Sequence, residues 1–183
     1  MLFGRPLSVH IAEMEHMRDC TQREMEREIA RKFATAQVAR TIANAIVEAD
    51  SSISVLILSG SPVIGSYEFR SGIDFVRIPG VVKQIDTGDY DSANLRVGVE
   101  HTLEIRKRII RDTADIYRPD LFIVDKEPLG LRGEVRETLR DLKRKGVPLV
   151  LGLRDVMDEP ALLAPEWERK KVLPALESLY DDI

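Results

Sequence analysis

The sequence predicts an α/β fold in which helices cover both faces of a parallel sheet. Short apolar runs alternate with helical patterns along most of the chain, and the runs are apolar throughout rather than at every second residue. Strands of this kind are typical of a parallel sheet that is buried on both sides and joined by right-handed crossovers. With 183 residues, 44% of them hydrophobic and 32% charged, the chain has the size and composition of one soluble domain.

The N-terminal part differs from the rest. Residues 13–32 carry many charges of both signs among good helix formers and contain neither Gly nor Pro. We predict a long helix that continues in some form through residues 33–50. In that second part an apolar face recurs at helical spacing, formed by Ala39, Ile42, Ala43, Ile46 and Val47. We therefore expect residues 1–32 to be a charged helical extension that forms a homodimer, and residues 33–183 to be the folded domain.

Four β-branched or leucine-rich runs predict the strands. They are ISVLILSG, IDFVRIPG, LFIVD and VPLVLGLRD, at residues 53–60, 73–80, 121–125 and 147–155. The weakly apolar stretch over residues 82–92 is predicted as a loop.

Three helical patterns separate and follow these strands. The first runs from Ser92 or Asn94 to Tyr117 and ends there because Pro119 disfavours helix at the preceding residue. Its face is marked by Leu95, Val99, Leu103, Arg106, Ile109, Ile110 and Ile116. The second covers residues 134–146 and stops at its terminal glycine, and the third covers about 165–180.

Charge, cysteine content and hydropathy exclude several classes of protein. A net charge of -4 gives no cationic field for nucleic acid, so we expect no nucleic-acid partner. The single cysteine, Cys20, has no partner for an internal disulfide, which fits a reducing cytoplasmic setting. The apolar runs are far shorter than the roughly 20 residues that cross a bilayer, and no signal peptide is recognisable. Any membrane contact would be peripheral.

Candidate chemistry lies at the carboxyl ends of the predicted strands, because ligands of open parallel sheets bind there. After the first strand, Gly60 and Ser61 in SGSPVIGS offer small residues and backbone N–H groups that could approach a phosphate or sugar. The same residues are also ordinary turn formers, and the stretch matches neither a P-loop nor a dinucleotide fingerprint.

The third strand runs into DKEPLGLRGE. Asp125 or Glu127 could bind a hydroxyl or take a proton, and Gly130 and Gly133 would let the loop fold tightly over a ligand. A buried strand that ends in charged residues is equally ordinary where burial stops, so both interpretations stay open.

The fourth strand ends in LRDVMDEP. Arg154 could hold a phosphate or carboxylate, or pair structurally with Asp155 or Asp158. His10, His16 and His101 lie away from the strand ends and form no cluster with metal-ligand spacing, so we expect no metal site.

Five segments, taken in order, resemble one known family. LILSGSP, GIDFVRIPGVVK, RPDLFIVDKEPLGLRGE, LVLGLRDVMDEP and the closing W…LYDDI look like the N-terminal half of predicted bacterial MurG-like glycosyltransferases of the two-domain GT-B fold. The resemblance covers about residues 38–183. It implies a Rossmann-like domain that faces a sugar or lipid-linked acceptor, while a second domain binds a nucleotide-sugar donor, commonly a UDP-sugar, without a metal.

The resemblance also assigns the candidate residues. It implies a base from this half of the enzyme without identifying it, and the catalytic candidates are Asp125, Glu127 and Glu134. The acceptor side would be lined by Gly60, Ser61, Lys126, Gly130, Arg154 and Asp155. No covalent cofactor is implied.

Two features differ from the family. The chain ends about where the family continues into its donor domain, and residues 33–50 lack the Gly-His loop that precedes the corresponding helix. We therefore expect a split glycosyltransferase that works with a separate donor-domain chain. The alternatives are an inactive binding or assembly module and, from another class, a receiver-like signalling domain with Asp125 at its strand end. A receiver also needs an acidic pair after its first strand, which SGSP does not supply.

Overall fold

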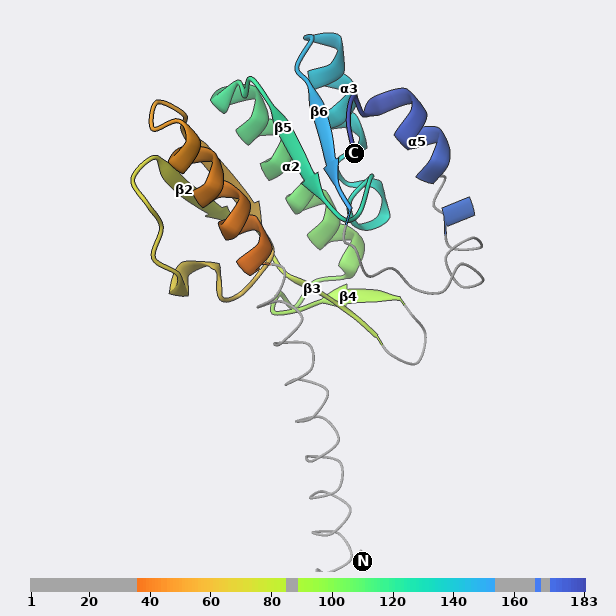
Figure 1. Ribbon diagram of the computed structural model, residues 1–183. Helices are drawn as coiled ribbons and strands as arrows, with labels where there is room; N and C mark the ends of the chain where they lie inside the picture. Colours follow the sequence, from red (N-terminus) through yellow and green to blue (C-terminus); the bar gives the residue numbers. More distant parts are fainter. Residues whose placement is uncertain (1–35, 85–88, 154–166, 169–171) are drawn as a thin grey trace, which may run out of the picture. The chain divides into compact units, whose positions relative to one another are not determined.

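A computed structural model describes residues 36–84, 89–153, 167–168 and 172–183, which form a mixed α/β structure (Figure 1). The chain divides into two compact units, Met1–Arg77 and Ile78–Ile183. Residues 33–183, which were predicted as one domain, are divided between the two units. The helix predicted over residues 13–32 lies outside the described residues.

The first unit contains a helix over residues 36–49 and two parallel strands. β1 (Val55–Ser59) pairs with β2 (Ile73–Arg77), and Val55 lies opposite Ile73. The short 3-10 helix η1 (Ile64–Ser66) lies between the two strands in the sequence. The first two predicted strands and their parallel pairing are therefore confirmed.

One cluster of apolar side chains forms the core of this unit. Ala43 of the helix, Ile57 of β1 and Ile64 of η1 are buried together. The rings of Phe69 and Phe75 lie beside them with centroids 5.5 Å apart. The apolar spacing of residues 39–47 thus gives the helix the face that packs against the strands.

The second unit begins with a hairpin and continues with strands and helices in alternation. Its elements are β3 (Val81–Lys83), β4 (Tyr90–Ser92), α2 (Val99–Tyr117), β5 (Phe122–Asp125), η2 (Leu131–Gly133), α3 (Arg136–Arg144), β6 (Leu149–Gly152) and α5 (Val172–Leu179). β5 and β6 are parallel, which confirms the third and fourth predicted strands. The predicted helix over 134–146 is confirmed in its central part, and α5 confirms part of the last one.

The prediction of a loop over residues 82–92 was wrong. β3 and β4 pair antiparallel, with Val81 opposite Ser92. Backbone hydrogen bonds from Gln84 N to Asp89 O, 2.7 Å, and from Ala93 N to Gly80 O, 3.0 Å, lengthen the hairpin at both ends. Strands of three residues are too short to show a period in the sequence, and their stability comes from this pairing.

The prediction of where α2 begins was also wrong. The helix starts at Val99 after an N-cap at Gly98, whose carbonyl accepts hydrogen bonds from the N–H groups of His101 and Thr102. The Ser92 hydroxyl donates to Val97 O, 2.9 Å, and lies 2.6 Å from the hydroxyl of Thr102. These bonds hold residues 93–98 outside the helix.

The end of α2 agrees with its prediction. Arg118 follows the helix in the left-handed region, with φ 52°, immediately before Pro119. Leu103, Arg106 and Ile110 are buried as expected, but Ile116, assigned to the same face, is 82% exposed. The apolar face of α2 therefore ends at Ala114.

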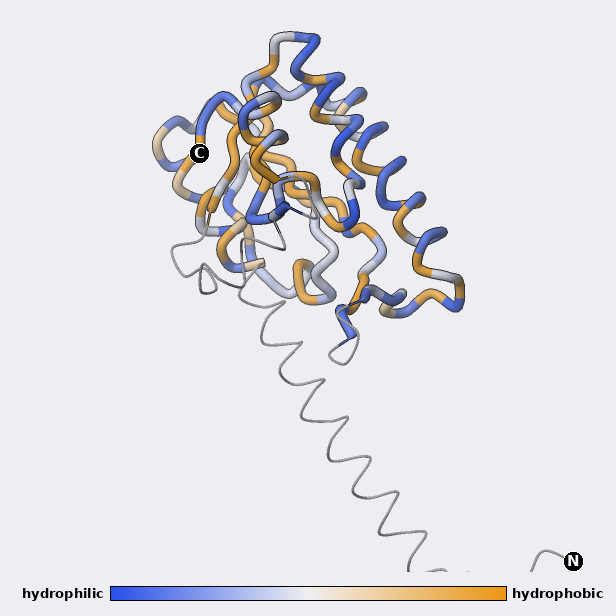
Figure 2. The backbone as a smooth tube through the Cα atoms, turned by 90° about the vertical axis from the view of Figure 1, so that its right-hand side faces the viewer, coloured by the Kyte–Doolittle hydropathy of each residue, from blue (hydrophilic) through white to orange (hydrophobic). Residues whose placement is uncertain are grey.

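The core of the second unit lies between the sheet and α3. Leu149 and Leu151 of β6 and Leu139 of α3 are fully buried. Apolar and polar residues alternate along the helices (Figure 2), as expected for helices with one buried face. Within the described residues, no helix has both the length and the hydropathy needed to cross a membrane.

We predict that Leu139→Ala will destabilise the protein by about 2–5 kcal/mol, because the side chain has 0% exposure and its loss leaves a cavity. Urea unfolding followed by circular dichroism measures this. Ile116→Ala is the matched control, since that side chain is 82% exposed and should cost less than about 0.5 kcal/mol. Equal effects of the two substitutions would contradict the assigned core.

Candidate functional site

The carboxyl ends of β5 and β6 lie side by side. Asp125 is in register with Gly152, and the N–H of Lys126 donates to Gly152 O at 2.8 Å, one residue beyond the strand. The loop after β5 and the segment that begins at Leu153 therefore start at the same edge of the sheet. This confirms that the second and third of the three predicted strand ends open together.

Tight turns and left-handed residues shape the loop after β5. Glu127 N donates to Asp125 O and Gly130 N to Glu127 O, both at 2.8 Å. Lys126 (φ 68°), Gly130 (φ 67°), Arg132 (φ 51°) and Gly133 (φ 85°) all have positive φ. For non-glycine residues this conformation is uncommon and costs on the order of 1 kcal/mol or more.

Gly130 allows the loop to approach its own end. A Cβ at this position would lie 2.9 Å from Cγ of Glu134 and 3.2 Å from a methyl of Val135. A side chain at Gly130 would therefore clash as well as strain the backbone. The loop is therefore tightly folded around Gly130, and its closure over a ligand stays a prediction.

A buried ion pair holds the end of the loop. Arg106, on the inner face of α2, donates from Nε and Nη2 to the two carboxylate oxygens of Glu134, each at 2.6 Å. Its third nitrogen, Nη1, donates to the carbonyl of Pro79 at 2.7 Å. Arg106 and Glu134 are each only 6% exposed to solvent. This parallel two-bond geometry is the strongest form of an arginine–carboxylate contact.

The surroundings of Glu134 give it a positioning role. Its Oε1 also accepts a weak hydrogen bond from Leu131 N at 3.4 Å, inside the loop. Because both oxygens are occupied and buried, the carboxylate ties the loop to α2 rather than facing a ligand. The two other catalytic candidates, Asp125 and Glu127, are half-buried and each interacts with other residues; their proposed roles stay predictions.

Arg132 fastens the middle of the loop. Its guanidinium forms ion pairs with Glu100 at the start of α2 and with Asp89, the latter at 3.2 Å, and lies 5.9 Å from the centre of the Tyr90 ring. The loop is thus attached both to the β3–β4 hairpin and to α2.

Tyr180 fastens the beginning of the loop. Its buried hydroxyl donates to the carbonyl of Pro128 at 2.5 Å. Burial raises the pKa of the Tyr180 phenol well above its usual value, because the charged form would lose its hydration. Sequence reasoning missed both Arg106 and Tyr180 as loop contacts. An arginine on an otherwise apolar helix face was the available signal for the first.

Lys126 differs from the other charged residues of the loop. Its side chain is exposed and forms no ion pair with any described residue. The loop thus presents an exposed lysine between Asp125 and Glu127 in the sequence, where β5 ends.

The remaining predicted site residues lie elsewhere. Gly60 and Ser61 follow β1 in the first unit, where Ser61 is 5% exposed and its N–H donates to the hydroxyl of Ser59 at 3.1 Å. The Ser61 hydroxyl accepts from Val63 N at 3.4 Å, which fits a turn. Arg154 and Asp155 lie outside the described residues.

The described residues contain no group of three or more His, Cys, Asp or Glu side chains placed to hold a metal ion. In the loop after β5, both oxygens of the Glu134 carboxylate are instead bound by Arg106.

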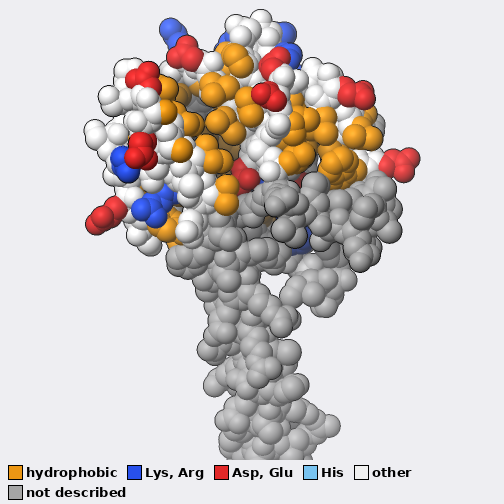
Figure 3. Space-filling model, in the orientation of Figure 1, with side chains coloured by type: hydrophobic (Ala, Val, Ile, Leu, Met, Phe, Trp, Pro, Cys, Tyr) orange, Lys and Arg blue, Asp and Glu red, His pale blue; other side chains and the backbone are white. Residues whose placement is uncertain are grey.

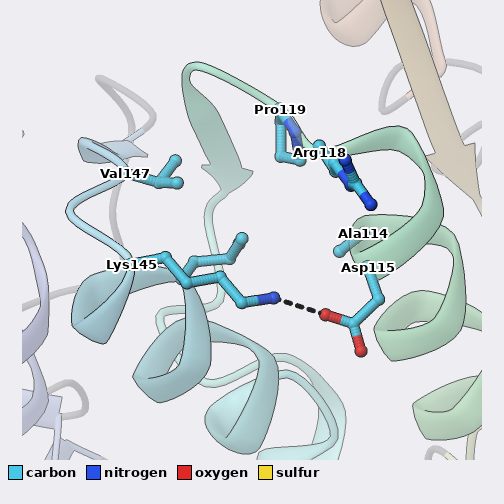
Figure 4. Close-up of a pocket in the computed structure, with 7 residues that line it drawn as sticks. Ala114, Asp115, Arg118, Pro119, Lys145 and Val147 are labelled. Atoms are coloured by element: carbon cyan, nitrogen blue, oxygen red, sulfur yellow. Dashed lines mark hydrogen bonds and ion pairs between the residues drawn. The ribbon is translucent and has the colours of Figure 1, made fainter.

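A hollow of about 490 Å³ lies near the opposite end of the β5–β6 sheet (Figure 4). It is lined by Ala114, Asp115, Arg118, Pro119, Leu142, Lys145 and Val147. Lys145 Nζ donates to Asp115 at 2.6 Å, and this hydrogen bond lowers the pKa of the Asp115 carboxyl. Because this pair neutralises two of the three charges, the hollow is a weaker candidate for chemistry than the loop.

Comparisons with known proteins give no match. No protein-family model matches the chain, and neither a curated protein nor a solved structure is significantly similar to it.

We predict that Glu134→Gln will destabilise the protein by about 3–5 kcal/mol, because it leaves the buried Arg106 without its counter-charge. Urea unfolding measures the loss. In the double variant Arg106→Met/Glu134→Leu, apolar side chains replace both charges, and most of the stability should return. The matched control Glu137→Gln removes an exposed carboxylate that pairs with Lys107 and should cost less than about 1 kcal/mol. A Glu134→Gln variant as stable as this control would contradict the proposed role of the pair.

We predict that Tyr180→Phe will cost about 1–2 kcal/mol at pH 7, because Pro128 O loses its buried donor. The folded pKa of Tyr180 is raised, so its contribution is complete below the unfolded pKa of about 10 and declines as the pH rises above it. The stability difference between the wild type and Tyr180→Phe should therefore shrink from pH 7 to about pH 10.5. Urea unfolding at both pH values tests this, and a constant difference would contradict it.

Proposed function

We propose that this chain is the acceptor-side part of a split, sugar-nucleotide-dependent glycosyltransferase. In this proposal the mixed α/β structure is a Rossmann-like domain with helices on both faces of its sheet, and a separate chain supplies the UDP-sugar site. The five sequence segments that resemble MurG-like glycosyltransferases, in the same order, support this proposal. The acceptor would be a sugar or a lipid-linked sugar, and the setting cytoplasmic, with peripheral membrane contact.

The observation that carries the proposal is the fixed loop at the carboxyl end of β5. Arg106 of α2 binds its end, Tyr180 after α5 binds its beginning, and the loop's own Arg132 pairs with Asp89. Asp125, Lys126 and Glu127 lie at its start. Binding sites need groups held in place before the ligand arrives, since ordering them afterwards costs free energy. A loop fastened in this way, at the sheet edge where α/β proteins bind ligands, is suited to an acceptor site.

Each proposed residue has a separate role in the transfer reaction. The acceptor hydroxyl oxygen attacks the anomeric carbon of the donor sugar, and the bond from that carbon to the UDP oxygen breaks. The hydroxyl proton passes to Asp125 or Glu127 as general base. Lys126, together with Arg154 and Asp155 from the sequence after β6, would orient the acceptor, and the backbone of Gly130 would permit its close approach. UDP leaves with its negative charge.

The test measures UDP release from UDP-sugars by the full chain alone and after mixing with a candidate donor-domain chain encoded nearby. We expect turnover only in the mixture. Either Asp125→Asn or Glu127→Gln should lower kcat by about 10²–10⁴-fold, as loss of a general base does. Glu104→Gln, which removes an exposed carboxylate on α2 that pairs with Arg108, is the matched control and should leave kcat unchanged.

Two results would overturn the proposal: no turnover together with no binding of any donor-domain chain, or full kcat in both the Asp125→Asn and the Glu127→Gln variants. Binding of a partner without turnover would indicate an assembly module instead.

A further inference from the structure

Two polar atoms in the first unit are buried and lack a hydrogen-bond partner among the described residues. They are Nε of Arg40 and Oδ1 of Asn44. The two residues are four positions apart in the helix over residues 36–49, so they lie on the same face of that helix, one turn apart. Leaving a buried polar atom unbonded costs free energy, and most such atoms in folded proteins have a partner. The two atoms together therefore point to a partner that the described chain does not supply.

The helix over residues 36–49 packs against the segment that follows β1. Alanines of the helix and apolar side chains of that segment belong to one cluster, formed among others by Ala36, Ala39, Ala43, Val63, Ile64 and Tyr67. The guanidinium carbon of Arg40 lies 5.3 Å from the centre of the Tyr67 ring, within the range of a cation–π contact. Arg40 therefore borders the same segment in which Gly60 and Ser61 were predicted to approach a phosphate or sugar.

The charge of Arg40 has no counter-ion among the described residues. Its guanidinium forms no ion pair or hydrogen bond with any of them, whereas Arg70 of the same unit pairs with Glu48 at 3.6 Å. On the face drawn in Figure 3, the described basic side chains stand among acidic ones rather than in one basic patch. An anion would therefore be recognised by local contacts, and a guanidinium binds phosphate or carboxylate oxygens through two parallel N–H groups.

We propose that Arg40 and Asn44 bind a small ligand that carries an oxyanion next to a hydroxyl group. Nε and one terminal nitrogen of Arg40 donate to two oxygens of the oxyanion. Oδ1 of Asn44 accepts from the hydroxyl, because an amide oxygen can only accept. Such a ligand gives each of the two buried atoms its missing partner, while the Tyr67 ring keeps the guanidinium in place. All three residues belong to the first unit, and this proposal does not depend on the proposed function.

A stability measurement distinguishes a ligand from a structural partner such as a bridging water. A permanent partner would stabilise the folded chain, whereas an atom kept for a ligand stays unbonded in its absence and lowers stability. Asn44→Leu removes Oδ1 and replaces the amide with an apolar side chain. We expect this variant, without ligand, to unfold at the same urea concentration as the wild type or at a higher one.

Binding is tested by NMR titration of the full chain, labelled with nitrogen-15, through the signals of Arg40 Nε–H and of the Asn44 side-chain amide. The probes are glycerol phosphate, glycerate and inorganic phosphate, each added to about 10 mM. We expect glycerol phosphate or glycerate to shift both signals, and the tighter of the two identifies the oxyanion as phosphate or carboxylate. Inorganic phosphate should bind about tenfold more weakly than that probe, because it lacks the neighbouring alcohol hydroxyl.

Variants assign the binding to these residues. Arg40→Lys keeps the charge but removes Nε–H, and should raise the dissociation constant of the tighter probe about tenfold or more, as should Asn44→Leu. Arg70→Lys, the same change at an exposed arginine of the first unit, should leave that constant unchanged. The proposal is overturned if no probe shifts the two signals, if Arg40→Lys binds like the wild type, if inorganic phosphate binds as tightly as the other probes, or if Asn44→Leu is less stable than the wild type.

Discussion

The bidentate contact between Arg106 and Glu134 fixes the part of the molecule on which the candidate site depends. The two residues are separated by 28 positions, and the guanidinium also binds the carbonyl of Pro79. One side chain of α2 therefore sets the position of the segment before β3 and of the loop before α3. A buried ion pair adds little net stability compared with apolar packing, but breaking it leaves an uncompensated charge. The contact thus favours one arrangement strongly over its near alternatives.

The position of this loop end determines the strain at its beginning. The strand ladder continues as far as Lys126 N, so β5 directs the chain along the sheet until that residue. Eight positions after Lys126 the chain must reach Glu134, whose carboxylate is bound by Arg106. The turn is accommodated by left-handed conformations at Lys126, Gly130, Arg132 and Gly133. Two of these residues are not glycine, and their conformations persist because contacts at both ends of the loop determine the path.

Local patterns in the sequence were sufficient for the larger elements. The four predicted strands, the end of α2 before Pro119 and the central part of α3 all follow from apolar runs, helical spacing and the stop signals Pro and Gly. They were insufficient for the β3–β4 hairpin and for the start of α2. Those depend on backbone pairing between short polar segments and on the hydrogen bonds of Ser92, which no periodicity records.

In the candidate site, too, the sequence predicted the local features and missed those that depend on distant contacts. The sequence placed Asp125, Lys126, Glu127 and Gly130 in one strand-end loop, because charges and glycines followed a buried strand. It could not distinguish Glu134 from these residues, since the distinction lies in a partner on another helix.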